Sequence, residues 1–233
     1  MSDICRIVFP LYEGVTQLDF TAPHQFFNRM PGARTVVASM GGRDIEADGL
    51  VFARLADLAA VEACDVLCVP GGFGTTAAML DEDFMAQIRR LGGSARYVTS
   101  VCTGSLILAA AGLLQGRKAA CHWAWRDLLT LFGVEVDEAR VSRDGNVFTG
   151  GGVTAGLDFA LVVGAEIFGE QAARSVQLGL EYAPSPPFVG GRPEEAPAEV
   201  LALVRQMMAA AAADRQAGAE EAARRLKAAL ATA

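Results

Sequence analysis

Histidine is scarce in this chain of 233 residues, which has only His24 and His122, and basic side chains form no cluster. The formal net charge of -7 repels phosphate backbones, which argues against a nucleic-acid partner. The N-terminus lacks a basic segment followed by a long apolar run, and no stretch of about 18 uncharged apolar residues occurs. We therefore expect a cytoplasmic protein with no membrane span and no nucleic-acid partner.

Cysteine usage excludes two further classes of protein. The five cysteines are an odd number, and their spacing matches neither a disulfide framework nor paired C-x-x-C zinc ligands. Cys5, Cys64 and Cys68 lie in or beside apolar segments, so we interpret them as small buried side chains. The sequence does not decide the role of Cys121, which is next to His122. We expect reduced thiols and no metal site.

What the chain does contain is a regular alternation of strands and helices. Apolar runs predict buried strands at 4–11, 35–39, 65–70 and 97–101, and Asp-Gly pairs predict hairpins at 45–52 and 141–149. Helices are predicted at 24–29 (with Pro23 in the first turn), 81–92, 103–111, 124–132, 154–168 and 171–180. This order predicts an α/β fold, a doubly wound and mostly parallel sheet with flanking helices.

The composition changes at Ala183. Residues 183–197 contain five prolines and two glycines, which excludes a regular element there. The Ala-rich stretch from 198 onward predicts one or two surface helices. We expect an α/β domain over 1–182 and an extension over 183–233, packed on the same domain or on a dimer partner.

Cys102 lies between a predicted buried strand and an apolar helix, with little room for a loop. A residue in that place sits on a sharp turn like the nucleophile elbow of α/β-hydrolases. The start of the helix also favours thiolate over thiol. A buried cysteine with no reactive role is the alternative, and the local pattern leaves both open.

Two other segments are expected near Cys102, because parallel strands bring their carboxyl ends to one edge of the sheet. The Gly71–Gly74 run offers backbone N–H groups for an oxyanion hole or a phosphate, or it makes a tight turn. Glu13 and Asp19 are both expected in the loop after the first strand, and desolvation of Asp19 there would raise its pKa towards a range useful for proton transfer. A helix cap or a surface acid is the alternative for Asp19. His122 is placed to reach the site, and His24 is expected to serve packing.

Together these segments resemble the ThiJ/PfpI superfamily, which is glutamine-amidotransferase-like. The resemblance rests on Val69-Pro70-Gly71-Gly72, on Val101-Cys102-Thr103-Gly104 and on the acid after the first strand, and it covers about residues 4–180. It implies a flavodoxin-like fold, a homodimer, and a cysteine on a nucleophile elbow hydrogen-bonded to an acidic residue.

A narrower similarity within the superfamily is carried by the segments 16–19, 95–106, 110–116, 122–124, 143–146, 149–152, 180–184 and 186–188, and so reaches into the proline-rich segment. In these segments the sequence resembles isocyanide hydratases. This resemblance implies a lyase that hydrates an isocyanide to an N-substituted formamide through a thioimidate on the cysteine, without a cofactor.

The resemblance assigns roles residue by residue. Cys102 resembles the nucleophile and Asp19 the general acid/base. Thr103 resembles a neighbour that helps to hold the acid and offers its backbone N–H. The substrate-binding residues implied are Gly71, Gly72, Gly151 and Val153, the last two at a flexible helix start.

Two departures from the wider superfamily affect the function. Thr103 stands where protease-like members have a histidine after the cysteine, which disfavours peptidase chemistry. Asp19 replaces a longer glutamate. A glyoxalase-like enzyme and a redox or small-molecule sensor are the alternatives. Regulators that carry this domain need an added helix-turn-helix, for which the chain is expected to have no room.

Overall fold

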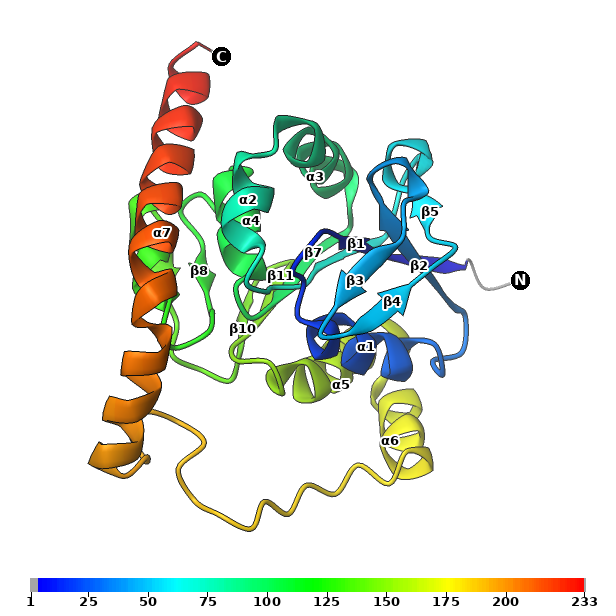
Figure 1. The fold of residues 1–233 in the computed structure, drawn as a ribbon. Coiled ribbons are helices and arrows are strands. Elements are labelled where there is room, and N and C mark those ends of the chain that lie inside the picture. Colours follow the sequence, from blue (N-terminus) through cyan, green and yellow to red (C-terminus); the bar gives the residue numbers. More distant parts are fainter. Residues whose placement is uncertain (1–3, 233) are drawn as a thin grey trace.

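The centre of the molecule is a seven-stranded sheet with the order β10-β11-β7-β6-β1-β2-β5. The computed structural model describes residues 4–232 (Figure 1). The strands are β1 (Cys5–Leu11), β2 (Ala33–Ser39), β5 (Ala56–Asp57), β6 (Val66–Val69), β7 (Tyr97–Val101), β10 (Val141–Asp144) and β11 (Val147–Gly150). Only β10 pairs antiparallel with its neighbour in this sheet, so the predicted mostly parallel sheet is confirmed.

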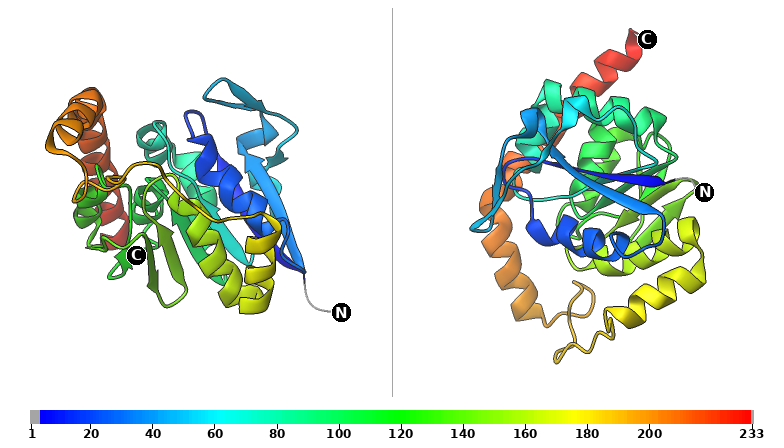
Figure 2. Two further views of the ribbon diagram at one scale, coloured as in Figure 1. Left: turned by 90° about the horizontal axis from the view of Figure 1, so that it is seen from below. Right: turned by 90° about the vertical axis from the view of Figure 1, so that its right-hand side faces the viewer.

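Helices cover both faces of this sheet (Figures 1 and 2). One face carries α1 (Gln17–Phe27), α5 (Ala155–Phe168) and α6 (Glu170–Gly179). The other carries α2 (Thr75–Leu80), α3 (Glu82–Ser94) and α4 (Gly104–Ala110). Because both faces are covered, the central strands are largely apolar, and the polar Thr99 and Ser100 of β7 are buried with them.

Smaller elements complete the fold. A hairpin joins β3 (Ile45–Ala47) to β4 (Leu50–Phe52), and a parallel pair joins β8 (Lys118–Ala119) to β9 (Glu135–Val136). Short 3-10 helices occur at Met40–Gly42, Leu58–Ala60 and Arg126–Phe132. Asp48 and Gly49 join β3 to β4 with φ of 53° and 79°. Positive φ at both central residues is what a type I′ hairpin turn needs, so the predicted hairpin is confirmed.

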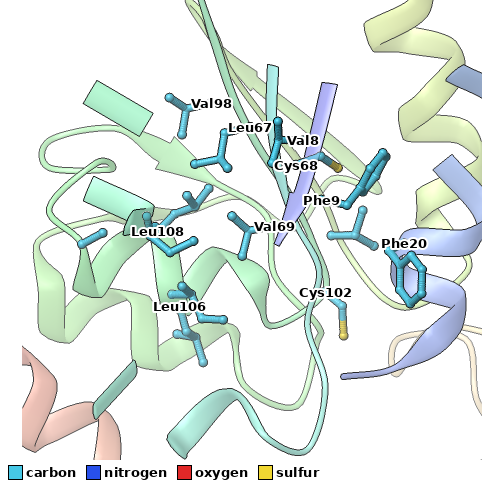
Figure 3. Packing of buried hydrophobic residues seen from close by; sticks show 14 of the residues in the cluster. Val8, Phe9, Phe20, Leu67, Cys68, Val69, Val98, Cys102, Leu106 and Leu108 are labelled. Carbon is cyan, nitrogen blue, oxygen red and sulfur yellow. The ribbon is translucent and has the colours of Figure 1, made fainter. Parts of the chain in front are cut away.

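The core lies between the sheet and the helices (Figure 3). Val8 of β1, Leu67 and Val69 of β6, and Leu106 and Leu108 of α4 are fully buried in one continuous apolar cluster. Burying a side chain of this size stabilises the fold by about 1.5–3 kcal/mol. This packing fixes the ends of β6 and β7, from which two segments of the candidate site emerge.

Two helix predictions were wrong. α1 begins at Gln17, with Pro23 in its interior, because burial of Phe20, Phe26 and Phe27 against the sheet outweighs the loss of one backbone donor. Asp19 therefore lies in the first turn of a helix and not in a loop. The second error concerns Gly92, which does not end its helix but lies inside α3 against Leu113.

The segment predicted as a helix at 124–132 is a 3-10 helix, Arg126–Phe132, and it ends at Gly133 with a φ of 71°. α2 was not predicted at all. Six residues that begin with two threonines give no helical period, so the sequence carries no signal for it.

The C-terminal part of the chain forms one long helix, α7 (Ala198–Ala231), which no regular element connects to α6. It stands beside the domain, on the side opposite β2 (Figures 1 and 2). α7 contacts α2, α4 and the 3-10 helix at 126–132. Within residues 4–232, no helix combines the length and apolar character needed to cross a membrane.

The contact between α7 and α2 leads to the first prediction. A Cβ at Gly218 would overlap Thr76 Cγ2, so the two helices touch there without room for a side chain. Gly218→Leu should lower the free energy of unfolding by about 1–3 kcal/mol, measured by urea denaturation. Ala217→Leu, at the exposed neighbouring position, is the matched control. Equal stability of the two variants would contradict this packing.

Candidate active site

Cys102 forms a sharp corner between β7 and α4. Its φ is 59°, in the left-handed region that few residues other than glycine adopt. The backbone N–H of Cys102 donates to Gly150 O at 3.0 Å, which ties the corner to β11. Gly104 allows the close approach, because a Cβ there would overlap Val69 O. The corner predicted from the sequence is therefore confirmed, and Figure 3 shows Cys102 beyond the end of the strand that carries Val69.

Asp19 reaches the same place from the first turn of α1. It is fully buried, and its Oδ2 accepts a hydrogen bond of 2.9 Å from the Gly71 N–H. Its Oδ1 has no hydrogen-bond partner in the described structure. Burial raises the pKa of Asp19 from 3.8 to about 7, against the opposing effects of the Gly71 N–H and the Cys102 thiol. A carboxyl with this pKa exchanges protons near neutral pH.

The thiol of Cys102 is neutral in this environment. Burial is the main cause that raises its pKa well above 9, and the charge of Asp19 raises it further. The Thr103 backbone N–H acts in the opposite direction. The N–H group at the helix start therefore acts in the expected direction, but burial outweighs it, so the pKa of the thiol is raised and not lowered.

Thr103 and Asp19 are hydrogen-bonded to neighbouring residues of the same loop, Gly72 and Gly71, and not to each other. Thr103 Oγ1 accepts from the Gly72 N–H at 3.0 Å and lies 2.8 Å from Thr75 Oγ1. Gly71 lies between Thr103 and Asp19, and a Cβ on Gly71 would be 2.9 Å from Asp19 Oδ2 and closer still to Thr103 N. Because residue 71 has no side chain, the start of α1, the loop at Gly71 and the corner at Cys102 can pack closely together.

A cavity of about 150 Å³ opens beside Cys102. Among its lining residues, Phe73, Trp125, Val153 and Met208 are apolar, and Thr16, His122 and Arg215 are polar or charged. Of the residues predicted for the site, Cys102, Thr103, Gly72 and Val153 line this cavity. Gly151 lines an adjoining cavity of about 250 Å³ that also contains Cys121 and His122.

The two histidines differ in position and role. His122 lines the cavity, and burial, followed by the charge of Arg215, lowers its pKa to about 4. Its Nδ1 accepts from the Ala124 N–H at 3.2 Å, so the neutral ring carries its proton on Nε2. His24 lies 3.1 Å from Thr35 Oγ1 and packs edge-on against Phe9, as expected for a packing residue.

Five lining residues were not among the site residues predicted from the sequence, namely Thr16, Phe73, Trp125, Met208 and Arg215. Arg215 comes from α7 and is 2% exposed. Its Nη2 donates to Gly72 O at 3.0 Å and to Phe73 O at 3.1 Å, and its guanidinium lies 4.9 Å from the centroid of the Trp125 ring. An arginine in an Ala-rich helix with mixed charge is typical of a solvated surface, so no pattern could have identified it.

Residues 5–166 match the DJ-1/PfpI family. The chain belongs to this family. An isonitrile hydratase from Pseudomonas putida is 45% identical over 208 residues, which are 88% of this chain and 90% of that protein.

Solved structures agree with the family assignment and with the predicted resemblance. A ThiJ/PfpI family protein from Pseudomonas syringae is 40% identical, with a TM-score of 0.89, over 96% of this chain and 91% of its own. DJ-1beta from Drosophila melanogaster has a TM-score of 0.70 at 23% identity, over 79% of this chain and all of its own, and so shows the fold alone. The flavodoxin-like fold predicted for this DJ-1/PfpI protein is confirmed.

Gly71 is the first test of this geometry. Gly71→Ala should push Thr103 or Asp19 out of place, because the new methyl group meets backbone atoms that have little room to move. We expect a loss of about 1–3 kcal/mol in the free energy of unfolding, measured by urea denaturation. Gly93→Ala in α3, where nothing lies within 4 Å of the added Cβ, should be neutral or stabilising. A neutral Gly71→Ala variant would contradict the close approach.

Asp19 should make the stability depend on pH. An acid whose pKa is raised by folding binds its proton more tightly in the folded state, so stability falls as the pH rises from 3.8 to about 7. The full effect is about 4 kcal/mol. The stability of Asp19→Asn relative to the unmodified protein should therefore be higher at pH 8 than at pH 4.5. The asparagine keeps an acceptor for the Gly71 N–H. Urea denaturation at both pH values measures this change, and an equal difference at both would contradict the raised pKa.

Proposed function

We propose that this protein hydrates an isocyanide to an N-substituted formamide, with Cys102 as nucleophile and Asp19 as general acid/base. The observation that carries the proposal is the Cys102 thiol, which lines a small cavity, with the carboxyl of Asp19, of pKa about 7, buried beside the thiol and outside the cavity lining. The 45% identity to an isonitrile hydratase along most of both chains supports the choice of substrate. The expected homodimer and the absence of a cofactor belong to the same proposal.

The first step forms a bond between Cys102 and the substrate. The terminal carbon of an isocyanide accepts both a nucleophile and a proton. As Sγ bonds to that carbon, the ionised Asp19 takes the thiol proton and delivers it to the same carbon. The product is a thioimidate, in which Sγ is joined to a carbon that carries one hydrogen and a double bond to nitrogen.

The second step adds water. Asp19, ionised again, takes a proton from water as the water oxygen bonds to the thioimidate carbon, and that proton passes to the nitrogen. The tetrahedral intermediate then breaks its carbon–sulfur bond. The oxygen loses its proton to the departing sulfur, which leaves a formamide and the original thiol. The sum is one isocyanide plus one water, with nothing oxidised or reduced.

Both steps need one group that takes and gives a proton near neutral pH. Asp19 meets this need because burial raises its pKa to about 7. His122 is less suited, since its pKa is lowered to about 4 and its ring stays neutral. The apolar residues Phe73, Trp125 and Val153 fit a substrate whose substituent is hydrocarbon-like.

The test is turnover of an aryl isocyanide, followed by absorbance and by the mass of the formamide. Cys102→Ala should reduce kcat/KM by at least about 10³-fold, and Asp19→Asn by about 10²–10⁴-fold. Cys5→Ala, which removes a thiol at the start of β1, should leave turnover unchanged.

Two results would contradict the proposal. One is comparable turnover in Cys102→Ala. The other is no isocyanide turnover by a folded protein whose Cys102 still reacts with iodoacetamide. In the second case, turnover of methylglyoxal would indicate the glyoxalase-like alternative.

A further inference from the structure

Arg215 brings a positive charge into the cavity of Cys102 from a part of the chain outside the family match, which ends at residue 166. The side chain is 2% exposed. Nη2 makes two hydrogen bonds to the Gly72 and Phe73 carbonyls, and Nε and Nη1 have no hydrogen-bond partner within residues 4–232. Buried donors are nearly always satisfied, so two free ones on a residue that lines a cavity point to a ligand.

The surroundings of Arg215 do not neutralise its charge. The two backbone carbonyls and the face of Trp125 offer partial compensation, but they are not anionic. The carboxylate of the exposed Asp214 also acts on Arg215, but only at a distance, since the described residues show no ion pair between the two side chains. A buried charge costs several kcal/mol unless it is paired. If Arg215 served only to hold α7 to the loop at Gly72 and Phe73, a neutral amide would supply the same hydrogen bonds without burying a charge.

We infer that Arg215 is a catalytic residue, which stabilises the negative charge that develops on Cys102 Sγ and on the bound substrate. The inference rests on the proposed role of Cys102. Cys102 and Arg215 line the same cavity of about 150 Å³, so a ligand bonded to Cys102 would share this small space with the Arg215 side chain. Fixed charges aimed at developing charge commonly make the greatest single contribution to catalysis.

The other groups that face Cys102 cannot take this role. Its titratable and charged neighbours are Asp19 from α1, Tyr12 after β1, Cys121 and His122 after β8, and Arg215 from α7. Asp19 raises the pKa of the thiol, and His122 is neutral at pH 7. Tyr12 is neutral as well, with its hydroxyl donating to Pro70 O at 2.9 Å and its pKa raised by burial. Among these neighbours, Arg215 is the group with a full positive charge at pH 7.

The experiment measures the reactivity of Cys102 without any isocyanide. The rate at which iodoacetamide modifies the Cys102 peptide is followed by mass spectrometry from pH 6 to pH 10. Arg215→Met, which keeps the apolar stem and removes the charge, should shift this profile to higher pH and slow modification at pH 8 by about 10-fold. Arg215→Lys should keep most of the rate. The kcat/KM for an aryl isocyanide should fall about 10²-fold in Arg215→Met.

Two control variants distinguish the loss of the Arg215 charge from a loss of packing between α7 and the rest of the domain. Leu226→Ala removes a buried contact of α7 outside the cavity, and Arg225→Met removes a surface charge on the same helix. Both should keep the Cys102 profile of the unmodified protein. The inference is overturned if Arg215→Met has an unchanged profile, or if Leu226→Ala shifts it equally. A shifted profile in a protein that does not hydrate isocyanides would support Arg215 while the proposed reaction fails.

Discussion

A carboxyl and a thiol that are held together away from water cannot both be ionised. Burial raises the pKa of each group, and the charge of Asp19 raises that of Cys102 further. The pair therefore carries one negative charge at most at neutral pH, and the remaining proton can move between the two groups. Three features of the local structure hold the carboxyl and the thiol together. The start of α1 must approach the cysteine corner, residue 71 must lack a side chain, and Cys102 must adopt a left-handed backbone conformation.

The sequence predicted those parts of the site that depend on neighbouring residues. The bounds of β7 and the corner at Cys102 follow from an apolar strand that runs directly into an apolar helix. The meeting of Asp19 with Cys102 follows from a rule about parallel strands, so it was predictable without knowledge of side-chain packing. The element that carries Asp19 was not predictable in the same way. Pro23 locally favours a helix that starts near residue 23, and only burial of aromatic side chains against the sheet moves the start to Gln17.

The remaining part of the site depends on contacts between distant segments. Met208 and Arg215 enter the cavity because α7 packs against α2, where Gly218 meets Thr76. Nothing near Arg215 in the sequence marks it, since arginine and glutamate recur along the exposed side of the same helix. The pKa of Cys102 also depends on contacts between distant segments. A helix start predicts a lower value, but the extent of burial decides the sign, and burial is a property of the assembled fold.

Two parts of the chain contribute side chains to the cavity, the segment that carries Cys102 and the helix α7. The segment shared with the DJ-1/PfpI family contains the thiol, the carboxyl of Asp19 and the backbone N–H of Thr103, and the effect of that N–H on the pKa of Cys102 is smaller than the effect of burial. A positive charge close by stabilises a thiolate in such a position. Since burying a lone guanidinium is unfavourable, its presence beside the cavity is best explained by a charge that exists only during the reaction. We therefore infer that α7 completes the active site.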